Sequence, residues 1–266
     1  MTNTVLEVYE YLDSIAPFEL QESYDNAGLL VGDVEAVVTG VLICLDSTEV
    51  IIDEAIQKGC NLVIAHHPII FSGLKQLIGE NYIQRTIMKA IKNDIAIIAI
   101  HTNLDNVLTN GVNEMIASKL KMTNISILAP KNQDITDEVA GAGVVGGLPE
   151  KMDTEEFFDF LKKQMQLSVI KHTDICFENI QKIAICGGSG GFLLEHAKAA
   201  GAQVFVTSDY KYHEFFDADG DIIIADIGHY ESEHYTIELL YKLVKEKFST
   251  FAAHYTLQST NPVYYY

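Results

Sequence analysis

The sequence is poor in basic residues, and this shortage limits the partners that the protein can have. Its 266 residues include 18 lysines and arginines against 37 aspartates and glutamates, which gives a formal net charge of -19. A surplus of negative charge repels the phosphate backbone of nucleic acids and attracts cations. Nucleic acid is therefore not an expected partner, whereas metal cations are compatible with the charge.

The sequence also lacks a long hydrophobic run and a secretory signal. Its longest apolar stretches, such as IAIIAI at 95–100, are far shorter than the roughly 20 residues that a membrane helix needs. The N-terminus has no basic segment followed by an apolar one; instead, Thr4 and Glu7 form the capping-box pattern that opens a helix. We therefore expect a cytoplasmic protein that does not span a membrane.

The cysteines form no CxxC pair, which argues against a redox or structural-zinc motif. Three of the four lie within or beside apolar segments, so we expect buried, free thiols. The four are Cys44, Cys60, Cys176 and Cys186.

Apolar segments alternate with amphipathic ones in the first half of the chain, as in a parallel α/β unit. No short-period repeat is visible, which excludes solenoids and propellers. The expected strands are 37–46, 61–66 and 95–101, and the expected helices are 47–59, 81–94 and 111–120.

Residues 124–150 interrupt this alternation with a strand-like ISILA, the acidic stretch NQDITDE at 132–138 and a glycine-rich segment typical of a hairpin or a crossing between units. The alternation then resumes. We therefore predict two related α/β units, 1–125 and 126–266, each with a mainly parallel sheet and helices on its faces. The C-terminal helix and strand could pack back on the first unit.

Polar residues follow the apolar strands one after another, at the position where open parallel sheets bind ligands. Asp46 ends the first strand, His66 and His67 end the second, and His101 ends the third, with Asp105 four residues further on. In the second half, His229 follows Asp226 in the same way.

The adjacent pair His66 and His67 suits a centre with two cations, because each imidazole could bind a different ion. Adjacent strand residues point to opposite faces, so both rings reach one site only if the strand stops between them, which Pro68 favours. The alternative is one packed and one solvated histidine.

His229 and Glu233 are four residues apart, which places them one turn apart on one side of a helix and allows joint metal ligation. The alternative is a helix-opening residue and an acid that stabilises the first turn. Asp105 has a similar alternative as a residue that caps the helix after it. We expect His196 and His234 to be exposed helix residues.

A rival pattern is G-x-S-x-G around Ser189, between a strand and a helix, as in a nucleophile elbow. Asp209 or Asp226 and then His229 follow in the order of a serine-hydrolase triad. Glycine-rich turns of this kind also serve tight packing or anion binding. The third glycine of a dinucleotide fingerprint and a Walker A lysine are both missing.

Several motifs together resemble the NIF3-like family, also called GTP cyclohydrolase 1 type 2, from one end of the chain to the other. They are SYDNAGLLVGD (23–33), LICLDST (42–48), AHHPIIF (65–71), HTNLDN (101–106), GGSG (187–190), TSDYKYH (207–213), DIGHYESE (226–233) and NPV (261–263). The resemblance implies a two-domain NIF3-like α/β fold and a toroidal homohexamer with a dinuclear metal site in each subunit.

Matched motif by motif, the resemblance implies that the metal ligands are His66, His67, Asp105, His229 and Glu233. The donor set suits two divalent ions of zinc, iron, manganese, cobalt or nickel.

The resulting hypothesis is a metal-dependent hydrolase in which activated water attacks a small molecule, with opening of the guanine imidazole ring of GTP as the reaction that the family name implies. His101 is the candidate for orienting a ligand or transferring a proton, with Asp209 and His213 as further candidates. The alternatives are a non-catalytic, metal-binding regulatory or scaffold protein and a serine hydrolase that uses Ser189.

Overall fold

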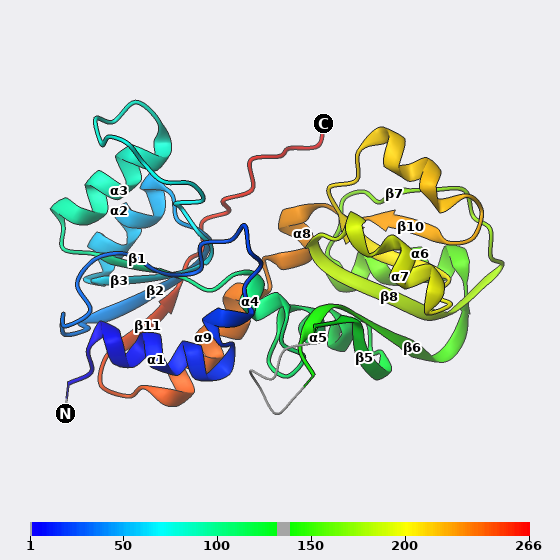
Figure 1. The fold of residues 1–266 in the computed structure, drawn as a ribbon, viewed down its shortest axis with the longest axis horizontal. Helices are drawn as coiled ribbons and strands as arrows, with labels where there is room; N and C mark the ends of the chain where they lie inside the picture. The colour runs from blue at the N-terminus through cyan, green and yellow to red at the C-terminus, as the bar shows by residue number, and fades with distance from the viewer. Residues whose placement is uncertain (1, 132–138) are drawn as a thin grey trace. The chain divides into compact units, whose positions relative to one another are not determined.

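The computed structural model describes residues 2–131 and 139–266, so the acidic stretch at 132–138 lies outside the described residues. The chain forms two compact units (Figure 1). The first unit is Met1–Leu104 with Thr236–Tyr264, and the second is Asp105–Tyr235 with Tyr265–Tyr266. In the described part of the chain, no helix is long and apolar enough to cross a membrane.

The first unit contains a five-stranded sheet in the order β1-β4-β3-β2-β11. Strands β4, β3, β2 and β11 run parallel, and β1 pairs antiparallel with β4. The strands are β1 Gly28–Val31, β2 Gly40–Asp46, β3 Leu62–His67, β4 Ala96–Ala99 and β11 Ala252–Tyr255. The helices are α1 Val5–Ile15, α2 Glu49–Lys58, α3 Tyr82–Lys92 and α9 Thr236–Lys247, with a 3-10 turn η1 at Phe18–Leu20.

Local sequence signals set the ends of these helices. The expected capping box of Thr4 and Glu7 opens α1. Gly59, in the left-handed conformation with φ 68°, ends α2. In Figure 1, α2 and α3 cover one face of the sheet and α1 and α9 cover the other. The strands between these two helix layers are buried along nearly their whole length, as expected for a parallel sheet.

The second unit contains a six-stranded sheet in the order β5-β6-β8-β9-β10-β7. The strands are β5 Thr123–Pro130, β6 Gly141–Asp153, β7 Lys171–His172, β8 Asn179–Ser189, β9 Val204–Ser208 and β10 Ile223–Asp226. The α-helices are α5 Val112–Lys119, α6 Thr154–Met165, α7 Leu194–Ala199 and α8 His229–Glu233. Two 3-10 segments, η2 Gly191–Leu193 and η3 Tyr212–Ala218, follow β8 and β9.

The α/β class with two units is confirmed, but the second sheet is not mainly parallel. Only β8, β9 and β10 run parallel, whereas β5, β6 and β7 join the sheet through antiparallel pairings. The glycine-rich segment is strand β6, which pairs with β5. Its glycines permit close approach, because a Cβ at Gly141 would lie 2.2 Å from the carbonyl oxygen of Ala129.

The division between the units precedes the predicted position near residue 125. Helix α5 contacts β6 and β8, and β5 pairs with β6, so both elements belong to the second unit. The crossing falls at Leu104, inside the short helix α4, Thr102–Asp105. At the other end of the chain, β11 pairs with β2, so the C-terminal helix and strand belong to the first unit.

The cysteines have the expected state. Cys44, Cys60 and Cys186 are buried, Cys176 is exposed, and all four are free thiols.

Candidate functional site

Three histidines of the first unit lie together at the carboxyl ends of β3 and β4, and we call them the histidine cluster: His66, His67 and His101. The ring centroids of His66 and His67 are 5.0 Å apart, and each of these rings lies 5.3 Å from that of His101. One ligand atom from each residue lies within 4.8 Å of the other two. His66 is fully buried, and His101 is 9% exposed.

The strand does not stop between His66 and His67, in contrast to the prediction. β3 continues to His67, which pairs with Asp46 of β2 in parallel register. His67 is nevertheless the last residue of the strand, directly before Pro68, and its ring still lies beside that of His66.

Each histidine of the cluster has a fixed acceptor at Nδ1. Nδ1 of His66 donates to the carbonyl oxygen of Ile100 at 2.8 Å. Nδ1 of His67 donates to Oδ1 of Asp46 at 2.7 Å, and Nδ1 of His101 donates to Oδ1 of Asp25 at 2.8 Å. A proton held at Nδ1 leaves the lone pair of a neutral imidazole on Nε2, which is the usual arrangement around metal-binding histidines.

Asp25 is a functional candidate that the analysis of residue spacing missed. Its side chain is fully buried and accepts hydrogen bonds from His101, from the backbone and hydroxyl of Thr102, and from the backbone of Asn26. Burial raises its pKa, but the bonds from His101 and Thr102 outweigh burial and lower the pKa to about 2. Asp25 is therefore an anion that orients His101. The only signal in the sequence was its place in the SYDN motif.

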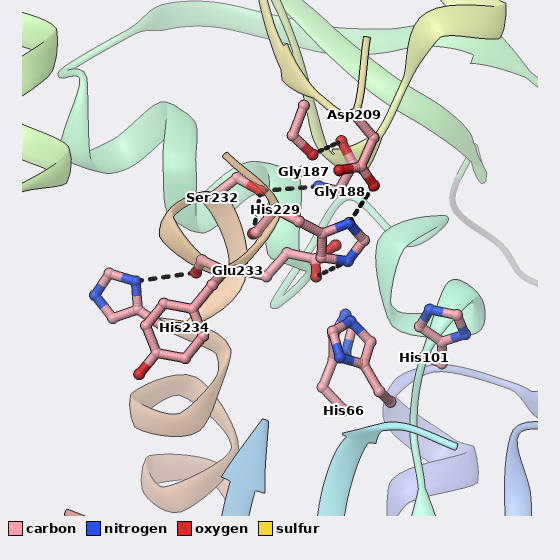
Figure 2. A network of polar contacts seen from close by, with 12 residues as sticks. His66, His101, Gly187, Gly188, Asp209, His229, Ser232, Glu233 and His234 are labelled. Atoms are coloured by element: carbon pink, nitrogen blue, oxygen red, sulfur yellow. Dashed lines mark hydrogen bonds and ion pairs between the residues drawn. The ribbon is translucent and has the colours of Figure 1, made fainter. Parts of the chain in front are cut away.

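The second unit brings together Asp105, His229 and Glu233. Helix α8 places His229 and Glu233 one turn apart, and Nε2 of His229 lies 2.9 Å from Oε2 of Glu233 (Figure 2). A carboxylate oxygen of Asp105, at the end of α4, lies within 4.8 Å of one from Glu233. Glu233 is only 2% exposed. The helical spacing predicted for His229 and Glu233 is confirmed, although α8 ends before α9 begins.

His229 is held by a second carboxylate at its other ring nitrogen. Nδ1 of His229 donates to Oδ2 of Asp209 at 2.7 Å. Burial lowers the pKa of His229, but Glu233 and Asp209 outweigh it and raise the pKa to about 11. Asp209 has a left-handed backbone with φ 61°, which directs it from the end of β9 toward His229. A positive charge between Glu233 and Asp209 is thus strongly favoured.

The glycine-rich turn after β8 packs directly against α8. The amide of Gly188 donates to Oγ of Ser232 at 3.0 Å, and the amide of Gly187 donates to Oδ1 of Asn113 at 2.9 Å. Gly188 has φ 63°, and a Cβ on it would lie 2.3 Å from Oε1 of Glu233. Of the roles considered for this turn, the structure therefore favours tight packing, with Glu233 as the packed group.

The serine-hydrolase alternative does not fit this geometry. Ser189 is the exposed last residue of β8, and it is paired with Ser208. Both ring nitrogens of His229 face carboxylates, Asp209 on one side and Glu233 on the other. Asp226 instead bonds Lys171 and the backbone of Tyr210 and Gly228. His229 is therefore not arranged as a base for Ser189.

The remaining histidines lie outside these two groups. His196 is exposed, as predicted. His213 is exposed beside Tyr212 and Phe216 and makes no described contact with His229 or Glu233. The prediction that His234 is exposed is wrong: it is partly buried, because its ring stacks on Tyr230 and lies 3.8 Å from the ring of Tyr235.

The chemistry of the donors fits a divalent transition metal. Four histidines each have Nδ1 bonded to a carboxylate or a carbonyl oxygen, and Asp105 and Glu233 add carboxylates. Neutral imidazole suits zinc, copper, iron and nickel, whereas carboxylates also suit manganese. The hydrogen bonds that orient these candidate ligands therefore form within each unit.

Comparisons with known proteins give one family. The family model described as Duf34/NIF3 (NGG1p interacting factor 3) matches residues 3–262. A Clostridium acetobutylicum protein named GTP cyclohydrolase 1 type 2 homolog is 33% identical over 243 residues, or 91% of this chain and 90% of that protein. A Campylobacter jejuni protein of the same name is 34% identical over 242 residues, or 90% and 91%.

Solved structures agree with these sequence matches. A crystal structure of a Staphylococcus aureus protein matches with a TM-score of 0.91 and 31% identity, covering 100% of both chains. A Bacillus cereus protein related to NIF3 matches with a TM-score of 0.90 and 26% identity, also covering 100% of both chains.

Proposed function

Because this chain belongs to the Duf34/NIF3 family, we propose that it is a metal-dependent hydrolase that holds two divalent cations. The proposed ligands are His66, His67, Asp105, His229 and Glu233.

One observation supports this proposal above the others: three histidines of the proposed set have Nδ1 committed to a protein acceptor. His66 bonds a carbonyl oxygen, whereas His67 and His229 bond carboxylates. This arrangement fixes the ring orientation and makes Nε2 the atom that would bind a cation once it carries no proton, and the carboxylate partners make the imidazole a stronger ligand. A purely structural histidine needs no such common arrangement.

Two bound divalent cations would supply Lewis acidity and lower the pKa of water from 15.7 toward about 7. Residues of the chain itself would support that chemistry. The buried carboxylate of Glu233 lies 2.9 Å from Nε2 of His229, and Gly188 packs against it. His101, oriented by Asp25, is the proposed group for moving a proton or orienting water.

The proposed substrate class is a nucleotide, and GTP is the first compound to test because the relatives bear the name GTP cyclohydrolase 1 type 2 homolog.

We further propose that the chain assembles as a homohexamer, as the family resemblance implies. Light scattering of the purified protein tests this directly, and a monomeric chain at micromolar concentration would refute the hexamer.

Metal analysis of the purified protein tests the central proposal. Wild-type protein should carry about two divalent ions per chain, and His67→Ala and Glu233→Ala should each lose one or both. His196→Ala is the matched control, because His196 is exposed and lies outside both groups. A folded wild type that binds no zinc, iron, manganese, cobalt or nickel would refute the proposal.

The family description as an interacting factor supports a second candidate, a metal-binding protein without catalysis that acts as a regulatory or scaffold component. Turnover assays of the metal-loaded wild type separate the two. Nucleotide turnover that is lost in Glu233→Ala supports the hydrolase. Full metal loading without turnover of any nucleotide supports the scaffold.

A further inference from the structure

We propose that Phe71 binds the purine base of the substrate by stacking, with Tyr24 as a second aromatic residue at the rim of the histidine cluster. The proposal rests on the proposed function, because it assigns the base-binding part of the same nucleotide site. It adds a part that metal ligands cannot supply, since cations select oxygen, nitrogen and sulfur atoms rather than the face of an aromatic ring.

Phe71 is an exposed aromatic residue in direct contact with the histidine cluster. The centroid of its ring lies 5.7 Å from that of His101, and the two ring planes are nearly perpendicular, at 87°. The side chain is nevertheless 52% exposed. Sites for small planar molecules combine aromatic walls with a few convergent polar groups, and Phe71 beside the three histidines has this composition.

The chain segment that leads to Phe71 is fixed on both sides of its backbone. Ile69 is buried in the core of the first unit, and Ile70 packs against the same core. The carbonyl oxygen of Ile70 accepts a hydrogen bond from Nδ2 of Asn26 at 2.6 Å. Phe71 therefore leaves the core from a fixed point, and a group that is already positioned loses less freedom when a ligand binds to it.

The hydrogen bond from Asn26 also joins this segment to a second exposed aromatic residue. Tyr24 is 64% exposed. It directly precedes Asp25, whose carboxylate accepts from Nδ1 of His101 at 2.8 Å. The two joined segments thus both contact the ring of His101, and each carries an exposed aromatic side chain beside that contact.

The stretch around Phe71 also has a charge that suits an anionic ligand. Residues 55–79 contain no aspartate or glutamate, although the whole chain has 37, and Lys75 within this stretch is exposed. The two carboxylates beside the cluster, Asp25 and Asp46, are each bonded to a histidine. The net charge of -19 opposes the phosphates of a nucleotide. Stacking of the base provides affinity that does not depend on charge.

A tryptophan at position 71 reports stacking directly, because the natural chain has no tryptophan. In the metal-loaded Phe71→Trp protein, GTP should quench the tryptophan emission, whereas inorganic triphosphate should leave it unchanged. Ile91→Trp is the matched control. Ile91 is also 52% exposed, and it lies near the end of α3 that leads to the amino end of β4, away from the histidines. Its emission should not respond to GTP.

Removing the ring should weaken nucleotide binding selectively. Phe71→Ala should lower the affinity for GTP by about 5–150-fold, which is the usual contribution of one stacked base. Phe71→Leu keeps an apolar side chain without the ring and should lose nearly as much, whereas Phe71→Tyr should keep the wild-type affinity. Inorganic triphosphate should bind equally to all four proteins. Isothermal titration measures both ligands.

Tyr24 is tested in the same way. Tyr24→Ala should weaken GTP binding, and Tyr24→Phe should not, because it keeps the ring. Elemental analysis should find wild-type metal content in every variant of either residue, since neither side chain is a proposed ligand. Circular dichroism and thermal unfolding establish that each variant is folded, and Phe71→Leu replaces Phe71→Ala if the smaller side chain prevents folding.

The outcomes separate this proposal from the proposed function. Equal GTP affinity in the wild type, Phe71→Ala and Phe71→Leu overturns the stacking role and leaves the metal-dependent hydrolase standing. So does Phe71→Trp emission that stays constant while GTP saturates the protein. Light scattering that changes in Phe71→Ala without a change in GTP affinity assigns the ring to a contact between copies instead. A metal-loaded wild type that binds no purine nucleotide refutes the nucleotide substrate as well.

Discussion

Gly188 and Glu233 are in direct contact, and the contact leaves no room for a side chain at position 188. A Cβ there would lie 2.3 Å from Oε1 of Glu233, and the backbone has φ 63°. Gly188→Ala should therefore displace the Glu233 carboxylate and cost about 1–2 kcal/mol of stability from the left-handed backbone alone. Metal content and thermal unfolding measure the two effects.

Gly147→Ala is the matched control for that substitution. A Cβ at Gly147 would meet its nearest atom, the carbonyl oxygen of Gln181, at 3.6 Å, which is ordinary contact. The control should keep wild-type metal content. Normal metal content in Gly188→Ala would show that the contact with Glu233 is not needed for binding.

Asp46→Asn should weaken metal binding by about 10–100-fold without unfolding the protein, because the carboxylate fixes Nδ1 of His67. Asp46 also accepts a hydrogen bond from Thr260, which an asparagine oxygen can still accept. Isothermal titration with Zn2+ measures the change, and Thr260→Val reports what the second bond contributes. Equal affinity in Asp46→Asn and wild type would contradict this role.

Without bound metal, the stability of the protein should fall as the pH rises from about 6.5 to about 11. The pKa of His229 is raised to about 11 in the folded chain, so its protonated form stabilises the fold. This contribution is complete below the unfolded-state pKa of about 6.5 and is lost as the pH passes through the folded-state value. Urea unfolding with a chelator should show the loss in wild type.

His229→Gln provides the comparison, because it removes this titration and keeps a polar side chain. The difference in unfolding free energy between wild type and variant should change steadily between pH 6.5 and 11. A constant difference over that range would mean that His229 is not charged beside Glu233 and Asp209.

Only Cys176 should react quickly with a thiol reagent in the native protein, because it is the exposed cysteine of the four. Burial raises the pKa of the thiols of Cys44, Cys60 and Cys186, the second of these to about 11, so they lack both access and thiolate. Labelling should count about one fast thiol before unfolding and none in Cys176→Ser. Rapid labelling of a second site would contradict the described burial.

The sequence predicts well where local patterns decide the structure. The apolar run before His66 and Gly59 at the end of α2 predict a βαβ unit, and α8 has the predicted i, i+4 geometry of His229 and Glu233. Local patterns do not predict strand direction, because a run of apolar residues does not distinguish parallel from antiparallel pairing. Hence β6 was expected only as a hairpin or a crossing, and its pairing with both β5 and β8 emerges from the fold.

The hydrogen-bond acceptors of the histidines could not be predicted from the sequence, for a related reason. Asp25 is 76 residues from His101 and lies in an irregular segment, so no periodicity connects them. Asp46 was visible as a polar strand end, but its bond to His67 depends on the register between β2 and β3. Candidate ligands can thus be found from strand ends, whereas the groups that orient them require the tertiary structure.

The pairing of β11 with β2 also has a consequence for biosynthesis. A ribosome releases β2, β3 and β4 long before β11, because the whole second unit is translated in between. Until then, the nascent first unit has β2 as an open edge, with its backbone amides and carbonyls available to other strands. The newborn chain should therefore depend on chaperones until its last helix and strand emerge, and truncation before α9 should produce aggregates rather than a smaller folded protein.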